Sequence, residues 1–402
     1  MPLLLEDIRV VEVATFVFAA AAGTVLSDFG AEVIHVESPG SGDPYRNLTR
    51  LRPLPECAEN YCWILDSRNK KSLVLDLKTD AGREVLVDLI GTADVFITNY
   101  HPSVIDDLGI TYAALSTANP RLVYAHATGY GEVGDEAEKP GYDATAWWAR
   151  SGLMDAVRPA GGELALATAG MGDHPSALSL VAGIALALYA RERTGKGTKI
   201  SSSLLANGAW ANSILIQAAL CGATTYVPPT QVDTPNAMVN HYRGSDGRSF
   251  YLVLIKETAE FTQFCEAIGR PDLARDPRFE ALAARRANAA ALTSLLSARF
   301  AQQTCEQWRA ILDAHGITFG IIATTDEVAA DEQMRRIGAF VDVAERPGTQ
   351  VVNSPFELRD FPKRAPQPPP ELGEHSAAIL RDLGYDDEHV ERLRANGIIN
   401  GA

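Results

Sequence analysis

The N-terminal region alternates apolar runs with a helix in an order that few folds allow. Two apolar runs, Ile8–Val13 and Glu32–Glu37, are typical of strands buried on both faces. Between them, the small-residue segment Ala19–Asp28 predicts a helix, which Gly30 closes. Strand, helix and strand in this order form a βαβ unit, and similar units farther along predict an α/β protein with a parallel sheet.

The loop after the first predicted strand lacks a phosphate-binding glycine pattern. A dinucleotide-binding chain would carry G-x-G-x-x-G there. This chain has Ala14–Ala20, which reads ATFVFAA. The sequence therefore disfavours an NAD-binding site at this loop. The alanines instead favour close packing of the helix against a bulky neighbour or a ligand.

Polar residues follow two of the later predicted strands. Lys78 comes directly after Leu73–Leu77, and Asn99 follows Ala93–Ile97. Ligands of open α/β sheets gather at the carboxyl ends of strands. We therefore expect a ligand-binding edge that includes both residues.

The pattern of predicted elements changes after Pro228-Pro229. A turn at Ser245–Arg248 predicts a hairpin, and amphipathic helices are expected at about Ala259–Ile268, Arg286–Ala301 and Cys305–His315. A single helix is expected from Leu205 to about Ala219. We predict a large domain whose N-terminal part is 1–224, a smaller α+β domain at 225–325 and a C-terminal segment at 326–402 that returns to the large domain. Within this segment, Pro362–Pro370 predicts an extended polyproline-type strap.

Charge and cysteine content exclude some functions. The 402 residues carry a net charge of −15, which argues against nucleic acid as a partner but leaves room for a phosphorylated group held by local Lys and Arg. Five scattered cysteines predict reduced thiols in the cytoplasm and no metal site. No signal peptide is recognisable, and Ala177–Leu188 is too short for a membrane span.

One carboxylate occupies a position with two interpretations. Gly172-Asp173-His174-Pro175 ends a loop, and a long apolar helix follows. Asp173 could be the helix N-cap, worth about 1 kcal/mol. The alternative is a nucleophile, because a carboxylate with a pKa near ~3.9 is ionised at neutral pH and needs no activating base. Helix-start N–H groups would then bind the oxyanion, and Gly172 would leave room for substrate.

An ordered set of motifs resembles a known family over nearly the whole chain. The set comprises Val36-Glu37, Gly42-Asp43, Arg68–Ser72, Leu75–Lys78, Ala93–Val95, Asn99-Tyr100, Asn119–Tyr124, Pro140–Asp143, Gly172–His174, Arg191–Gly197, Leu372–His375 and Leu383–Tyr385. In this order and spacing the motifs resemble the class III coenzyme A transferases, the CaiB/BaiF family.

The resemblance implies a fold and a reaction. It implies a Rossmann-like large domain completed by the C-terminal tail, a smaller domain between, and two chains interlocked as a homodimer. It gives Asp173 the role of nucleophile toward an acyl-CoA thioester, with an aspartyl anhydride and an aspartyl-CoA thioester as intermediates. Coenzyme A would enter as substrate, and no cofactor is implied.

The resemblance also implies a CoA site, with departures. The matching residues are Leu75, Asp76, Leu77, Lys78, Asn99, Tyr100 and His101. A glutamine used by some members falls near Phe18, and two arginines fall near Ser38 and Asp107. We expect Arg46 to bind the CoA phosphates in their place, with Arg68, Lys70 or Lys71 as alternatives.

Three further points stay open in the sequence. His174 could polarise the site or be an ordinary first-turn histidine, and Tyr142-Asp143 could line the acyl pocket or begin a helix whose Trp147 and Trp148 enter the core. An acyl-CoA racemase would use a His/Asp pair, which Tyr142 disfavours because a histidine is expected there. A CoA-binding protein without turnover is the remaining alternative.

Overall fold

The computed structural model describes residues 2–51, 54–224 and 226–400. The chain divides into two compact units. The first comprises Met1–Asp155, Ala165–Thr224 and Arg335–Ala402, and the second comprises Ala156–Leu164 and Thr225–Met334. The chain therefore leaves the first unit and later returns to it.

The first unit is built on a six-stranded parallel sheet with the order β3-β2-β1-β4-β5-β6. Its strands are β1 (Arg9–Val13), β2 (Glu32–Glu37), β3 (Lys71–Val74), β4 (Val95–Thr98), β5 (Val123–Thr128) and β6 (Lys199–Ser203). The predicted α/β class with a parallel sheet is confirmed. The strand order reverses between β1 and β4, and in sheets of this order the crevice at that point binds ligands.

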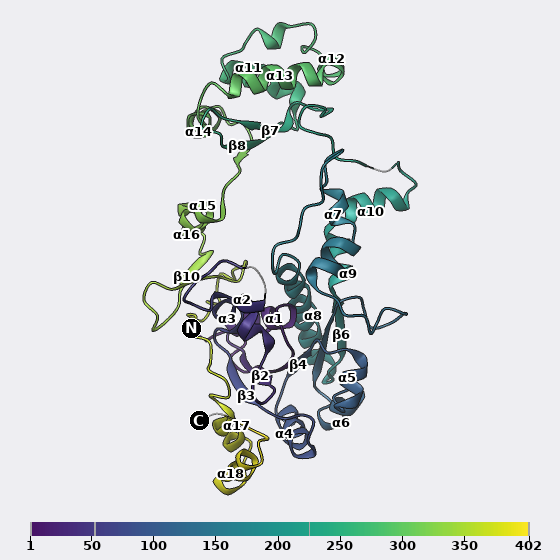
Figure 1. The fold of residues 1–402 in the computed structure, drawn as a ribbon, viewed down its shortest axis with the longest axis vertical. Helices are drawn as coiled ribbons and strands as arrows, with labels where there is room; N and C mark the ends of the chain where they lie inside the picture. The colour runs from purple at the N-terminus through teal and green to yellow at the C-terminus, as the bar shows by residue number, and fades with distance from the viewer. Residues whose placement is uncertain (1, 52–53, 225, 401–402) are drawn as a thin grey trace. The chain divides into compact units, whose positions relative to one another are not determined.

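Helices cover both faces of this sheet (Figure 1). The helices of the first unit are α1 (Phe18–Asp28), α2 (Leu48–Leu51), α3 (Tyr61–Ser67), α4 (Asp80–Gly91), α5 (Pro102–Asp107), α6 (Tyr112–Ala118), α8 (Asp173–Thr194), α9 (Leu204–Ala211), α10 (Ser213–Leu220), α17 (Ser376–Asp382) and α18 (Asp387–Ala395), with a 3-10 turn at Pro44–Asn47 and a π-helix at Asp143–Arg150. Two short helices, α7 (Leu153–Ala156) and α16 (Glu332–Arg336), lie where the chain passes from one unit to the other. A small hairpin joins β10 (Phe340–Asp342) to β11 (Gln350–Val352).

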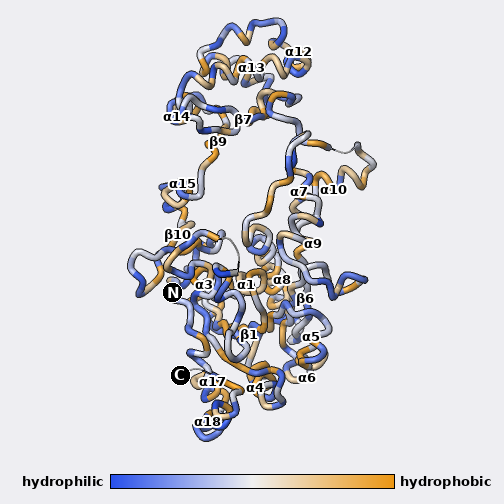
Figure 2. The backbone as a smooth tube through the Cα atoms, viewed as in Figure 1, coloured by the Kyte–Doolittle hydropathy of each residue, from blue (hydrophilic) through white to orange (hydrophobic). Residues whose placement is uncertain are grey.

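Alternating strand residues supply two hydrophobic cores. Val10 and Val95 point to the face covered by α1 and α8, whereas Val11 and Phe96 point to the opposite face with α4 and the C-terminal helices. This alternation is the two-residue period of a strand. Hydrophobic residues run along α1 and α8 in Figure 2, and the alanines of α1 let the two helices pack closely.

The C-terminal segment protects the edge strand β3. The N–H of His375 donates to the carbonyl of Ser72 (3.1 Å), and the N–H of Asp76 donates to the carbonyl of Ile398 (2.9 Å). Upstream, the proline-rich strap lies against the same unit, because the N–H of Arg364 donates to the carbonyl of Asp28 (2.6 Å). The bond to Ser72 covers part of an edge that would otherwise be open to other chains.

The second unit is α+β. Its sheet is antiparallel with the order β7-β8-β9, and its elements are β7 (Val239–Arg243), β8 (Ser249–Val253), α11 (Glu257–Ala267), a 3-10 turn at Leu273–Arg275, α12 (Leu282–Ala287), α13 (Ala289–Phe300), α14 (Cys305–Ala314), β9 (Phe319–Ile321) and α15 (Thr325–Ala330). The predicted hairpin is present as β7–β8.

Two helices that were expected to be continuous are each broken at an asparagine. Asn212 separates α9 from α10, and Asn288 separates α12 from α13. The Asn212 side chain donates to the carbonyl of Ser151 (3.2 Å), and that of Asn288 donates to the carbonyl of Ala284 (2.9 Å). The Asn288 amide competes locally with a helical backbone bond, and the Asn212 amide instead ties the break between α9 and α10 to the segment that follows the π-helix.

Candidate functional site

The site lies at the carboxyl edge of the sheet, where β1 and β4 end side by side. Asn99, after β4, holds the loop after β1: its Nδ2 donates to the carbonyl of Thr15 (2.6 Å) and its Oδ1 accepts the N–H of Thr15 (3.0 Å). The Asn99 side chain therefore positions the β1–α1 loop.

The next residue in that loop, Phe16, has a strained backbone. Its φ of 62° lies in the left-handed region, which costs a non-glycine residue roughly 1–3 kcal/mol. The Asp43 carboxylate compensates, because Oδ1 accepts the N–H of Phe16 (3.1 Å) and that of Tyr45 (2.8 Å). The ring of Phe16 is thereby fixed at the edge of the sheet.

A buried ion cluster stands behind Asp43. His35 lies between two carboxylates, with Nδ1 2.6 Å from Glu12 Oε1 and Nε2 3.3 Å from Asp43 Oδ2. Burial opposes the charged ring, but Asp43 and Glu12 outweigh it and raise the pKa of His35 to about 10. Lys70 Nζ lies 3.0 Å from Glu12 Oε2, which balances the second negative charge.

Asp173 is the first residue of α8, and Gly172 is its N-cap. The N-cap interpretation of Asp173 is therefore wrong. A crossover helix runs antiparallel to the strands it joins, so the start of α8 lies at their carboxyl edge. The positive end of a 22-residue helix favours an ionised carboxylate at this position by about 0.3–1 kcal/mol.

Gly172 makes room for a tryptophan, not for substrate. A β-carbon on Gly172 would lie 2.6 Å from Cγ of Trp147, which is buried and stacked on Trp148. The expectation that this glycine leaves the backbone open to substrate is therefore wrong. Both tryptophans belong to the core, as expected.

Most N–H groups at the start of α8 already donate hydrogen bonds within the chain. The N–H of Gly172 donates to Asp143 Oδ2 (3.5 Å), and that of His174 donates to the carbonyl of Gly170 (3.2 Å). Pro175 has no N–H. The expected set of free oxyanion donors at this helix start is therefore smaller than the sequence predicts.

A cavity of about 430 Å³ opens beside Asp173. Its walls come from the β1–α1 loop, α2, the start of the π-helix and the loop before α8. The lining residues are Phe16, Val17, Leu48, Tyr142, Asp143, Ala144, Thr145, Ala169, Gly170 and Asp173. Tyr142 and Asp143 thus line this cavity at the start of a helix, and their place in an acyl pocket stays a prediction.

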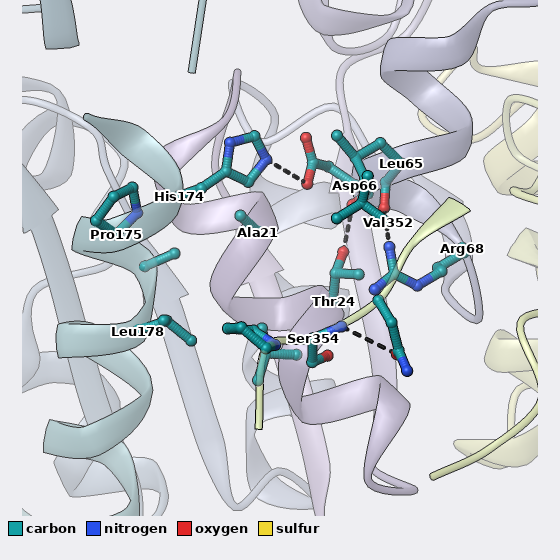
Figure 3. Close-up of a pocket in the computed structure, with 14 residues that line it drawn as sticks. Ala21, Thr24, Leu65, Asp66, Arg68, His174, Pro175, Leu178, Val352 and Ser354 are labelled. Carbon is teal, nitrogen blue, oxygen red and sulfur yellow. Dashed lines mark hydrogen bonds and ion pairs between the residues drawn. The ribbon is translucent and has the colours of Figure 1, made fainter. Parts of the chain in front are cut away.

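His174 does not line this cavity, and its side chain points toward Asp66 of α3 (Figure 3). Its Nε2 lies 3.1 Å from Asp66 Oδ1, and its Nδ1 lies 3.1 Å from the carbonyl oxygen of Gly170. Both partners are acceptors, so both ring nitrogens must donate and the ring must be an imidazolium. Burial opposes this charge, but Asp66 and Gly170 raise the pKa of His174 to about 9.

Asp66 anchors His174. The buried carboxylate also accepts the hydroxyl of Tyr45 (2.5 Å). Burial opposes its ionisation, but His174 and Tyr45 outweigh burial and lower its pKa. His174 therefore ties the Gly170 turn, which lines the Asp173 cavity, to α3.

A second cavity, of about 440 Å³, lies on this other side of α8 (Figure 3). Ala21 and Thr24 of α1, Leu178 of α8 and Val352 of β11 line it, with His174 and Asp66 at one end. Consecutive helical residues point about 100° apart, which is why Asp173 and His174 face different cavities.

The residues expected to bind CoA lie on one edge of the sheet. Leu75–Lys78 follow β3 and Asn99–His101 follow β4, three strand spacings or about 14 Å away. Leu75 and Leu77 are buried, so only their backbone groups are available to a ligand at this edge. Lys78 is exposed, and His101 is the N-cap residue of α5.

The basic residues near this edge differ in availability. Arg46 grips both oxygens of Glu37 (2.7 Å each) and lies 4.0 Å from the Trp63 ring, and Arg68 is buried against Asp28. Lys70 belongs to the buried ion cluster described above. Lys71 pairs with Glu32 at the surface with 41% of its side chain exposed.

Several site residues carried no recognisable signal in the sequence. The left-handed Phe16 stands where the sequence shows only the lack of glycine, and Leu48 and Gly170 lie in unpatterned segments. The Asp66–His174 pair joins residues 108 positions apart, a separation that no local pattern reports.

The described part of the chain shows neither a metal site nor a membrane-spanning helix. Within 2–51, 54–224 and 226–400, no group of three or more His, Cys, Asp or Glu side chains is arranged to hold a metal ion. Over the same ranges no helix has the length and apolar character needed to cross a membrane.

The strand order and the cavity that holds Asp173 define an α/β protein with a ligand-sized site at the carboxyl edge of its sheet. The chain belongs to CoA-transferase family III, whose family model matches residues 5–376. The predicted membership in the class III CoA-transferases is therefore confirmed.

Individual relatives match along almost their whole length. The chain is 30% identical to (R)-2-hydroxy-4-methylpentanoate CoA-transferase of Clostridioides difficile (99% of this chain, 100% of the relative) and 31% identical to cinnamoyl-CoA:phenyllactate CoA-transferase of Clostridium sporogenes (96% and 95%). It is 30% identical to succinyl-CoA:glutarate CoA-transferase of Mus musculus (98% and 90%). A crystal structure of a CaiB/BaiF family protein from Brucella suis superposes with a TM-score of 0.84 at 30% identity, covering 95% of this chain and 100% of that one.

Proposed function

We propose that this chain transfers coenzyme A from an acyl-CoA to a carboxylic acid, with Asp173 as the covalent nucleophile. The observation that carries the proposal is the position of Asp173, on the first turn of α8 and in the wall of a cavity at the carboxyl edge of the sheet. Family membership supports the class of reaction.

The proposed reaction conserves the carboxylate of Asp173. Its oxygen attacks the thioester carbon, the C–S bond breaks, and an acyl-aspartyl anhydride and CoA thiolate form. The thiolate attacks the aspartyl carbonyl and releases the donor acid, which leaves an aspartyl-CoA thioester. The acceptor carboxylate attacks this thioester, and the freed thiolate then takes the acceptor acyl group, so that new acyl-CoA and the ionised Asp173 result.

The proposed CoA site extends along the carboxyl edge from β3 to β4. Leu75, Asp76 and Leu77 would offer backbone groups, Lys78 its ammonium group, and Asn99, Tyr100 and His101 the other end of the site. Arg46 is retained as a phosphate ligand in this proposal, and binding there would require it to give up part of its grip on Glu37.

We also propose that the protein is an interlocked cytoplasmic homodimer. Helices α9 and α10 leave large apolar side chains uncovered, with Trp210 80% and Ile214 83% exposed. Exposed apolar surface of this kind is typical of a protein interface. The free state of all five cysteines supports a reducing compartment.

The geometry disfavours the racemase alternative. Tyr142 occupies the position at which a histidine is expected, and the Asp143 carboxylate accepts the backbone N–H of Ala144 (2.7 Å). An acyl-CoA incubated in deuterated water without acceptor acid should therefore keep its α-hydrogen.

Replacement of Asp173 tests the proposal. Asp173→Asn keeps the shape of the side chain but removes the nucleophile, so CoA transfer should be lost while the circular dichroism spectrum and CoA binding remain. Asp7→Asn, at an exposed position, is the matched control and should retain activity. Substantial transfer by purified Asp173→Asn would overturn the proposal.

A further inference from the structure

The His174 side chain connects the cavity beside Asp173 with α3 (Figure 3). Its Nδ1 lies 3.1 Å from the carbonyl oxygen of Gly170, which lines that cavity, and its Nε2 lies 3.1 Å from Asp66 Oδ1. Gly170 has a φ of 76°, and a β-carbon added to it would lie 2.8 Å from His174 Nδ1. The turn before Asp173 therefore packs directly on the His174 ring.

Asp66 is itself fixed from two sides. Its carboxylate is only 3% exposed, and Oδ2 accepts the hydroxyl of Tyr45 (2.5 Å). Its backbone carbonyl accepts the hydroxyl of Thr24 in α1 (2.5 Å). All three residues are buried, and charges shielded from water interact more strongly than exposed ones. Asp66 therefore determines where the His174 ring lies.

Resting on the function proposed above, we infer that Asp66 is a positioning residue of CoA transfer, because it holds His174 on the Gly170 turn and keeps a cation next to the nucleophile Asp173. Asp66 lines the cavity of about 440 Å³ and not the one beside Asp173. It therefore acts on Asp173 through His174.

The proposed reaction gains from positive charge near Asp173 in two of its steps. In one the CoA thiolate attacks the aspartyl carbonyl of the anhydride, and in the other the acceptor carboxylate attacks the aspartyl thioester. Each attack forms a bond to the side-chain carbon of Asp173 and moves the carbonyl electrons to its oxygen, until the donor acid or the thiolate leaves. A fixed cation on the next residue stabilises this oxyanion more than the uncharged carbonyl before it, which lowers the barrier.

The charged and titratable groups around His174 favour its protonated form. They are Asp173 on α8, Asp66 and Cys62 on α3, Tyr45 in the 3-10 turn, and Arg68 and Lys70 after α3, with Asp28 and Glu12 as the partners of these two cations. Burial opposes the charge, but Asp66, Gly170 and Asp173 raise the pKa of His174 to about 9. Because Arg68 and Lys70 are each compensated by a carboxylate, the ring keeps its charge at neutral pH.

The pH dependence of the wild-type enzyme is the first test. An acyl-CoA is incubated with its own isotope-labelled acid, and label entering the acyl-CoA measures transfer without knowledge of the natural acceptor. Acetate, succinate, 4-methylpentanoate and 3-phenylpropanoate are tried, and the fastest is used. We expect kcat to fall on the order of 10-fold as the pH rises through 9, less than the ~100-fold or more that a direct oxyanion donor is worth.

Asp66→Asn removes the charge of the carboxylate and keeps its shape. His174 stays buried but loses its main counter-charge, so the ring gives up its proton at a lower pH. At pH 7.5, kcat should be about 10-fold below that of the wild type, with the KM for acyl-CoA changed less than about twofold. The fall in kcat should lie at least about two pH units lower than in the wild type.

Asp28→Asn is the matched control. It removes a buried carboxylate from a different ion pair, in which Asp28 Oδ2 lies 2.6 Å from a guanidinium nitrogen of Arg68. It should lower stability as well, but kcat should still fall near pH 9. A merely structural role of Asp66 predicts the same pH profile for both variants.

Two further measurements do not depend on the folding of Asp66→Asn. His174→Gln should have a kcat about 10-fold below that of the wild type at pH 7.5 and no fall near pH 9. NMR of the 13C-histidine-labelled protein, with the His174 signal assigned from its loss in His174→Gln, should show the wild-type ring titrating near pH 9.

The outcomes separate the inference from the proposed function. Active wild-type enzyme with a kcat that stays constant through pH 10, a His174 ring that titrates near pH 6.5, or a His174→Gln variant with wild-type kcat would overturn the inference and leave CoA transfer intact. A fall in kcat at the same pH in wild type and Asp66→Asn would do the same. Wild-type enzyme that exchanges none of the four acids would contradict the proposed function, and the inference with it.

Discussion

Gly172→Ala tests how the start of α8 is positioned. The added β-carbon would lie 2.6 Å from Trp147 Cγ, so the contact must lengthen by about 0.8 Å to reach 3.4 Å, the start of ordinary contact. Trp147 is buried and stacked on Trp148 and cannot yield freely. Overpacking of this kind costs about 1–3 kcal/mol, and the gain from a less flexible unfolded chain returns about 0.4–1 kcal/mol. The free energy of unfolding should therefore fall by about 1 kcal/mol, within limits of about 0 and 2.6 kcal/mol.

The same shift moves Asp173, the next residue. A displacement on the order of 1 Å at a reacting group can lower the rate about 100-fold. The assay is urea unfolding followed by circular dichroism, together with the acyl exchange rate. Gly91→Ala, at the end of α4 with no atom within 4 Å of its added carbon, is the control and should stabilise. A Gly172→Ala protein with wild-type stability and rate would refute this account of α8.

Three further perturbations test the surroundings of the site. Lys70→Met leaves buried Glu12 without its main counter-charge, so the free energy of unfolding should fall by about 3–5 kcal/mol in urea, and a loss below 1 kcal/mol would contradict the ion cluster. Asn99→Ala frees the backbone of Thr15 and should lower stability by about 1–3 kcal/mol and weaken acyl-CoA binding; an unchanged KM would argue against Asn99 as the clamp of the loop. Because folding raises the pKa of His174 from 6.5 to about 9, its contribution to stability is complete below pH 6.5 and disappears as the pH rises through 9. His174→Gln should lack this loss between pH 6.5 and 9, and equal pH profiles of wild type and variant would refute the imidazolium, since His35 is common to both.

The sequence predicted the strands and helices whose apolar residues follow a local periodic pattern. Apolar runs such as Ile8–Val13 predict buried strands, and a parallel sheet follows from their alternation with helices. The helix beginning near Asp173 was predicted from apolar spacing that ends at Gly195. Element ends differ by a few residues, because caps and asparagine side chains decide them locally.

The site itself could be predicted only in part. Asp173 was found because a loop-to-helix junction and the family resemblance point to it. The surroundings of Asp173 could not be predicted, because they depend on contacts between distant segments. Trp147 fills the space beside Gly172, and Asp66 binds the side chain of His174. Burial and pairing likewise decide which basic residues remain available, and neither Arg68 nor Lys70 shows its buried partner in the sequence.

Mass spectrometry of the enzyme during turnover tests the central claim most directly. The protein is quenched with hydroxylamine while it exchanges acyl-CoA with a labelled acid, then digested, and the peptide that contains Asp173 is sequenced. The account predicts a hydroxamate on Asp173 that appears only when acyl-CoA is present. Rapid exchange with Asp173 unmodified, or a hydroxamate on another carboxylate, would contradict it.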